Sequence, residues 1–278
     1  MVPRRISARS HVGKPAYIEE VIHQRPLHAV TFDCWGTLIY ERDRHSGARM
    51  REELFGRTLR EHGIETTDEE TTTALNQAWR RHWQEWLAGV STDAIDIARW
   101  GLEAFGIEER ELAERLGHGL QEVALGQEVI ALEGAGETLE RLAQRDVKRA
   151  LICDTGFSPA RVVRQLLQRE GLLEYLEVQI FSDEAGVPKP NPRVFHAALG
   201  QLEVAPRHAL HVGDLRRTDI AGARAVGMGS VRIRWQHDDP SELPDAEQVA
   251  DSHAHLQEIL GIHDDQDEDG EKPKEGDF

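Results

Sequence analysis

Short apolar segments alternate with amphipathic segments through the second half of the chain, and this alternation restricts the fold more than any other feature. Segments rich in β-branched residues predict strands, and the segments between them have helical spacing. Strands that alternate with helices in this way form βαβ units and a parallel sheet. The predicted strands are 29–32, 147–153, 178–181, 209–212 and 229–234, and the helices between the later ones are 137–145, 159–169, 192–199 and 220–225.

The first predicted strand, AVTF at 29–32, ends abruptly at Asp33. Gly36 follows closely and permits a sharp turn, so Asp33 should lie at the carboxyl end of this strand. Right-handed crossovers bring the carboxyl ends of parallel strands to one edge of the sheet, where open α/β sheets bind ligands. We therefore expect Asp33, Thr155 and Asp214 to converge, although they are far apart in the sequence.

The region from about 49 to 132 differs from the rest, because its pattern is helical and contains no convincing strand. Thr67, with Glu70 three residues later, is typical of a capped helix start. The helix that follows places Trp79, Trp83 and Trp86 on one face. We interpret this face mainly as packing within a helical bundle, and the alternative is that one tryptophan lines a substrate pocket.

Composition excludes several classes of function. A formal net charge of −17 argues against non-specific binding of nucleic acid, which needs a basic surface. No apolar run approaches the about 18 residues that a membrane span requires, and the amino-terminal segment lacks the apolar core of a secretory signal. We predict a cytoplasmic protein, a monomer or a homodimer, with a loose basic arm at 1–24 and an acidic, disordered tail at 263–278.

Two further predictions concern residue types that often form special sites. The two cysteines, Cys34 and Cys153, make no disulfide framework, and we expect two small buried thiols in a reducing compartment. His253, His255 and His263 lie near the acidic end of the chain. We expect them on a solvated surface rather than in a metal site.

Four motifs occur in a fixed order along the chain. They are DCWGT at Asp33, ICDTG at Thr155, GVPKPNPRVF at Lys189, and GDLRRTDIAGARAVGM with Asp214 and Asp219. This set resembles the haloacid dehalogenase-like hydrolase superfamily over about 25–44 and 132–236. The resemblance implies a doubly wound, Rossmann-like α/β core at 25–44 and 132–262, with an inserted α-helical cap at 45–131.

The acidic residues predict a cation site. Two carboxylates about 4 Å apart repel by roughly 4 kcal/mol at an effective dielectric constant near 20, so such a site traps protons or binds a cation. Oxygen ligands beside phosphate favour Mg²⁺. The resemblance implies that Asp33, Asp214 and the Trp35 carbonyl hold Mg²⁺ with Asp219, although capping of a helix is an equally good interpretation of Asp219.

The remaining motif residues suit an anion. Lys189 lies between two prolines, in a stiff segment that aims its charge, and Gly156 leaves the backbone beside Thr155 approachable. The resemblance implies that Asp33 is a nucleophile, that Thr155 and Lys189 assist catalysis, and that Trp35, Thr155, Gly156 and Lys189 contact a small phosphorylated or anionic substrate.

Trp35 departs from the family's phosphatase pattern. Phosphatases of the superfamily usually have a second aspartate two residues after the nucleophile, which serves as general acid and base, and an indole cannot replace it. The leading hypothesis is a Mg²⁺-dependent phosphatase that works through an aspartyl-phosphate. The first alternative is a 2-haloacid dehalogenase in which Asp33 attacks carbon, and the second is a weakened or inactive member that binds a metabolite or a protein. Asp154 and Asp183 are the first substitutes to consider for the missing acid.

Overall fold

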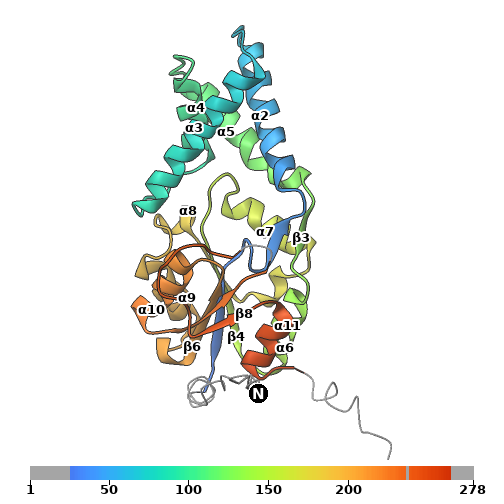
Figure 1. The fold of residues 1–278 in the computed structure, drawn as a ribbon, viewed down its shortest axis with the longest axis vertical. Coiled ribbons are helices and arrows are strands. Elements are labelled where there is room, and N and C mark those ends of the chain that lie inside the picture. The colour runs from blue at the N-terminus through green and yellow to red at the C-terminus, as the bar shows by residue number, and fades with distance from the viewer. Residues whose placement is uncertain (1–25, 236–237, 264–278) are drawn as a thin grey trace, which may run out of the picture.

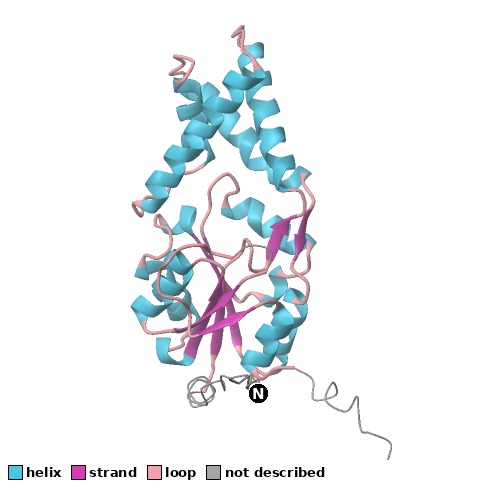
Figure 2. Cartoon of the chain, in the orientation of Figure 1, coloured by secondary structure: helices cyan, strands magenta, loops and turns pink. Residues whose placement is uncertain are grey.

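The computed structural model describes residues 26–235 and 238–263. They form an α/β core and a helical unit that stands over one end of its sheet (Figures 1 and 2). The predicted arm at 1–24 and almost all of the predicted tail at 263–278 lie outside the described residues. In the described part of the chain, no helix is long and apolar enough to cross a membrane.

The core is built on a parallel sheet of six strands in the order β5-β4-β1-β6-β7-β8. The sheet is parallel, and the crossovers that join β1, β4, β5, β6 and β7 in chain order each include a helix. This confirms the predicted α/β fold class. The strands are β1 (Ala29–Phe32), β4 (Lys148–Cys153), β5 (Val178–Phe181), β6 (Ala209–Gly213), β7 (Gly229–Ile233) and β8 (Gln248–Ala250).

Helices cover both faces of this sheet. Apolar residues of β1 alternate between two clusters, with Val30 and Phe32 in one and Ala29 in the other. The first cluster includes α6 (Ala135–Gln144), α7 (Ala160–Arg169) and α11 (His253–Leu260), and the second includes α9 (Pro192–Leu202) and α10 (Ala221–Val226). The short elements of the core are α8 (Ser182–Ala185), the 3₁₀ turns η2 (Leu173–Tyr175) and η3 (Pro206–His208), and the π-helical turn η4 (Arg216–Ile220).

A two-stranded antiparallel ribbon of β2 (Ile39–Glu41) and β3 (Val129–Ala131) connects the helical unit to the core. The prediction that no strand occurs between about 49 and 132 was therefore wrong at β3. Its three residues are too few to show a period of two, and its partner β2 lies about ninety positions away. At the end of the ribbon, the Arg42 backbone N–H donates to the Glu128 carbonyl at 3.0 Å.

Four helices between the two ribbon strands form the unit that we call the cap. The predicted helix start at Thr67 is confirmed, because Thr67 and Glu70 form a reciprocal capping box. The cap has its own apolar core, which includes Phe55, Leu59 and Ile97. The helices are α2 (Arg44–Glu61), α3 (Asp68–Leu87), α4 (Ala94–Glu103) and α5 (Arg110–Glu122), and the 3₁₀ turn η1 (Val123–Gly126) follows them.

The cysteine prediction is confirmed, whereas the histidine prediction is wrong at one position. Cys34 and Cys153 are free and buried, with Cys34 in the loop after β1 and Cys153 at the end of the neighbouring strand β4. His255 is partly exposed, but His253 is only 1% exposed. His253 is buried because the unpredicted elements β8 and α11 extend the core, which places this side chain against Thr37 and Thr138.

Candidate active site

The loop after β1 places Asp33 at the carboxyl edge of the sheet. The Asp33 backbone N–H donates to the Val212 carbonyl at 2.8 Å, which continues the pairing of β1 with β6. Gly36 then turns the chain with a φ of +76°, a value that other residues rarely adopt. A Cβ atom at Gly36 would lie 2.8 Å from Oδ2 of Asp214. The loop therefore needs glycine both for its turn and for its close approach to a carboxylate.

Three carboxylates meet at this edge, as the topology predicted for Asp33 and Asp214. Asp33 follows β1, Asp214 follows β6, and Asp219 lies in η4. One oxygen from each lies within 4.8 Å of the others. These three oxygens form a compact, all-oxygen donor set of the kind that suits Mg²⁺.

Lys189 is the cation of the cluster. Its Nζ donates to Asp33 Oδ1 at 2.5 Å and to Asp219 Oδ1 at 2.7 Å. The side chain is only 2% exposed, so it adds its charge in a nearly dry environment. The Lys189 backbone N–H donates to Asp154 Oδ1 at 2.9 Å, which fixes the proline-flanked segment against the end of β4.

Asp219 is held by more partners than the other carboxylates. Besides Lys189, its Oδ1 lies 3.3 Å from Nε2 of His211, and its Oδ2 accepts from the Leu215 backbone N–H at 3.0 Å. His211 was not predicted from the sequence, and its Nδ1 lies 2.7 Å from the Thr31 hydroxyl. The available signal was a histidine within an otherwise apolar strand. These contacts favour a supporting role for Asp219, in which it orients Lys189.

Burial and charge shift the pKa values of the cluster in different directions. Burial raises the pKa of Asp33 to about 7, even though Lys189 opposes the shift. Burial and the neighbouring Asp33 and Asp219 raise the pKa of Asp214. Burial would raise the pKa of Asp219, but Lys189 and His211 outweigh it and lower that pKa. Burial lowers the pKa of Lys189 less than the surrounding carboxylates raise it, so the amine stays charged.

Thr155 and Gly156 lie just beyond β4, next to the cluster. The Thr155 backbone N–H donates to Ser182 Oγ at 2.8 Å, and the two hydroxyl oxygens are 3.0 Å apart. Ser182 was not predicted, because its contact depends on the pairing of β4 with β5. Among the described residues, no hydrogen bond joins Thr155 to Asp33 or Lys189.

The two substitute acids named from the sequence already have partners. Asp154 accepts from the Lys189 backbone N–H and, at 3.0 Å, from the indole N–H of Trp86. Burial raises the pKa of Asp154. Asp183 accepts from the Ala160 backbone N–H at 3.0 Å, at the start of α7. Asp183 therefore stabilises a helix end, and Asp154 joins the core to the cap.

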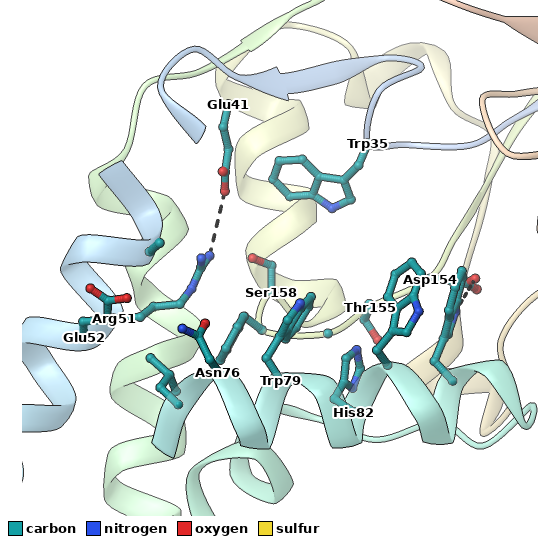
Figure 3. Close-up of a pocket in the computed structure, with 16 residues that line it drawn as sticks. Trp35, Glu41, Arg51, Glu52, Asn76, Trp79, His82, Asp154, Thr155 and Ser158 are labelled. Atoms are coloured by element: carbon teal, nitrogen blue, oxygen red, sulfur yellow. Dashed lines mark hydrogen bonds and ion pairs between the residues drawn. The ribbon is translucent and has the colours of Figure 1, made fainter. Parts of the chain in front are cut away.

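A cavity of about 410 Å³ lies between the cap and the edge of the sheet (Figure 3). Trp79, Trp83 and Trp86 of α3 all line it, together with Trp35 and Thr155. Packing within a bundle was therefore the wrong interpretation of this tryptophan face, since Trp79 and Trp83 are 36% and 47% exposed. The interpretation as a pocket lining agrees with the structure.

Three hydrogen bonds hold the carboxyl-terminal end of α3 and the following loop against the core. Trp86 donates to Asp154, the Ser91 hydroxyl donates to the Ser182 carbonyl at 3.2 Å, and Arg217 donates to the Leu87 carbonyl at 3.0 Å. The Arg217 guanidinium also lies 4.9 Å from the Trp86 ring centroid. The cap therefore covers the site through contacts with all three strand-end loops that follow β4, β5 and β6.

A parallel sheet with a carboxylate cluster at its carboxyl edge and a helical cap above it is the architecture of a capped, Rossmann-like α/β enzyme. A family model described as haloacid dehalogenase-like hydrolase matches residues 27–227, and the chain belongs to this family. Haloacid dehalogenase-like hydrolase domain-containing protein 3 of Bos taurus is 30% identical over 225 residues, which are 76% of this chain and 83% of that protein.

Relatives named for two different reactions also resemble the chain. (S)-2-haloacid dehalogenase 1 of a Pseudomonas species is 29% identical over 75% of this chain and 85% of that protein. The crystal structure of a haloacid dehalogenase-like phosphatase from Thermococcus onnurineus is 25% identical, with a TM-score of 0.58, over 85% of this chain and 99% of that one. These similarities agree with the family predicted from the four motifs.

Proposed function

We propose that the chain is a Mg²⁺-dependent hydrolase of small phosphate monoesters, with Asp33 as the nucleophile. The observation that carries this proposal is the cluster of Asp33, Asp214 and Asp219 around Lys189. Three carboxylates and one ammonium group leave an excess of negative charge in a buried place. A divalent cation offsets that excess, and a site for an anionic phosphoryl group needs such an offset.

Asp33, water and Lys189 have different roles in the proposed phosphoryl transfer. A carboxylate oxygen of Asp33 attacks phosphorus, and the ester oxygen leaves as the alcohol after it gains a proton. Water then attacks the phosphorus of the aspartyl-phosphate, which releases inorganic phosphate and regenerates the Asp33 carboxylate. Lys189 lies against both Asp33 and Asp219, so its charge opposes the negative charge that gathers on the transferred group.

Further residues are assigned to the metal ion and to the substrate. Asp33, Asp214 and the Trp35 carbonyl would hold Mg²⁺, and Asp219 orients Lys189 beside them. Bound Mg²⁺ neutralises charge on the phosphoryl oxygens. Thr155 and Gly156 line the cavity beside Asp154, which accepts from the Lys189 backbone N–H, and they would contact the substrate there. The cap contacts described above restrict entry of bulk water during the first step.

A 2-haloacid dehalogenase is the second candidate, and the Trp35 indole at the cavity wall favours it. In that reaction Asp33 attacks carbon and halide leaves, so no proton donor is needed for the leaving group. The acidic cluster weighs against this candidate, because the dehalogenase reaction assigns no role to the Asp214 carboxylate beside the nucleophile. Metal dependence therefore discriminates between the two reactions.

The test is a panel of phosphate monoesters and 2-haloacids, each assayed with Mg²⁺ and with EDTA. We expect Mg²⁺-dependent release of phosphate that EDTA abolishes reversibly. Asp33→Asn should remove turnover and keep the fold, because the amide has the same shape but is no nucleophile. Asp68→Asn, at an exposed position of the cap, is the matched control and should retain turnover.

Four results would contradict the proposal. Full activity in EDTA, or halide release without metal, would favour the dehalogenase. No turnover of any compound by the wild-type protein would favour a member that only binds its ligand. Retention of phosphatase turnover in Asp33→Asn would refute the covalent mechanism.

A further inference from the structure

The cavity under the cap has aromatic walls on two sides. Figure 3 shows Trp35, from the loop after β1, across the cavity from Trp79 and His82 of α3. Trp79 stacks on Phe157 with a centroid distance of 4.7 Å and an interplanar angle of 7°, so its ring is held in one plane by the core. His82 stacks on the same indole at 4.7 Å. The wall formed by α3 is thus a set of flat faces whose orientation is fixed by Phe157.

The aromatic side chains of this wall are more exposed to solvent than is usual for such apolar groups. Trp79 is 36% exposed and lines the cavity, whereas Trp100, in the apolar core of the cap, is only 8% exposed. Indole surface left in water is unfavourable, and a flat ligand that covers it gains both burial and stacking. The volume of about 410 Å³ falls within the range of small-molecule sites.

The far end of the cavity has the wrong charge for a second phosphate. Arg51 is its only cation among the described residues, and two carboxylates, Glu41 and Glu52, line the same end. Arg51 lies 3.8 Å from Glu41, and its guanidinium carbon lies 4.4 Å from the Phe157 centroid. Asn76 and Ser158 add uncharged hydrogen-bonding groups. The end distal to the cluster therefore suits a neutral group with polar edges.

We propose that this cavity binds the alcohol part of a phosphate monoester that carries an uncharged, planar heteroaromatic ring, as a nucleoside 5′-monophosphate does. The inference rests on the proposed phosphatase function and adds its substrate class. The ring lies between Trp35 and the aromatic row of α3, the polar edges meet Asn76 and Ser158, and the phosphate reaches the carboxylate cluster past Thr155.

The test compares adenosine 5′-monophosphate with ribose 5-phosphate. Both have a primary alkyl leaving group, so any difference reports the ring and not the ease of the chemical step. Stacking of a base on an aromatic side chain corresponds to an advantage of about fivefold to 150-fold. We expect kcat/KM to favour the nucleotide by a factor in this range, mainly through KM. Fructose 1,6-bisphosphate should be a poorer substrate than ribose 5-phosphate because of Glu41 and Glu52.

Variants of Trp79 test whether the preference for the nucleotide over ribose 5-phosphate arises in the cavity. Trp79→Leu keeps apolar bulk without a planar face and should remove at least about fivefold of the nucleotide preference, whereas Trp79→Phe should retain most of it. Gln77→Ala is the matched control, since Gln77 lies on the same helix, is exposed and does not line the cavity. Circular dichroism and thermal unfolding establish that each variant is folded.

The outcomes separate this inference from the proposed function. Hydrolysis of both esters with equal kcat/KM, or an unchanged preference in Trp79→Leu, overturns the aromatic site and leaves the phosphatase intact. If no ester is hydrolysed but adenosine quenches tryptophan fluorescence in wild type and not in Trp79→Leu, the hydrolase function fails and the aromatic site stands. Absence of both turnover and quenching overturns both.

Discussion

His253 should make the stability of this protein sensitive to acid. In the structure its Nε2 donates to the Thr37 carbonyl at 2.8 Å, and its Nδ1 lies 3.1 Å from the Thr138 hydroxyl oxygen. The side chain is 1% exposed. Burial lowers the pKa of His253 from 6.5 to about 4, because the hydrogen bond to Thr37 offsets only part of the desolvation.

The direction of the pH dependence is set by whether the folded or the unfolded state binds the His253 proton more tightly. The unfolded chain has the higher pKa for this residue, so acid favours unfolding. The stability due to neutral His253 is complete above about pH 6.5 and is lost as the pH falls toward 4. At about 1.36 kcal/mol per pKa unit, the full loss is about 3 kcal/mol, and the loss at pH 5 is about 2 kcal/mol.

The assay is urea unfolding of wild type and His253→Gln at about pH 7.5 and pH 5. Glutamine keeps a donor for the Thr37 carbonyl and does not titrate. The raised pKa values of Asp33 and Asp214 act in the opposite direction, because their protonation in acid stabilises the fold. They do so equally in both proteins and cancel in the comparison. We expect wild type to lose about 2 kcal/mol more than the variant between the two pH values. An equal loss would refute the role of His253.

Two further predictions concern the active-site loops that follow β6 and β1. Asp214→Asn removes one of three crowded carboxylates, so the metal-free protein should gain about 1 kcal/mol, or about 2–4 °C in Tm by calorimetry in EDTA, while Mg²⁺-dependent turnover is lost. An unchanged or lower Tm would contradict the assigned repulsion. Trp35→Asp supplies a general acid, whose full value is about 10²–10⁴-fold, and should raise the ratio of alkyl to aryl phosphate turnover. Wild-type protein that already hydrolyses both types equally fast would show that another group donates the proton.

The strands were predictable wherever the local pattern and the topology agree. β1, β4 and β6 are apolar runs that end in a turn residue or an acid, and the structure places them within a residue of the predicted positions. β3 and β8 were missed because each has three residues, which is too short for a period to appear. Their strand character comes from pairing with β2 and β7, and this pairing is a property of the folded chain.

The residues of the candidate site were also predictable only where the local pattern and the topology indicate them. Asp33 and Asp214 were found because βαβ topology alone brings the ends of β1 and β6 together. His211 and Ser182 were missed because their importance lies in a side-chain contact across the sheet. Arg51 was missed because no motif marks it, and its place beside Phe157 depends on how the cap docks. The position of Lys189 between prolines indicated an aimed charge but did not identify Asp219 as its second partner.

The ribbon of β2 and β3 makes the cap an exchangeable module. Chain entry and exit lie side by side, with the Arg42 N–H 3.0 Å from the Glu128 carbonyl, so the two covalent connections between the core and the insertion form a single seam. A tight turn can bridge that seam in place of all four helices, and the order of the six strands does not depend on what lies beyond it. New specificity can therefore arise by recombination at residues 42 and 128, while the nucleophile-bearing framework is inherited unchanged.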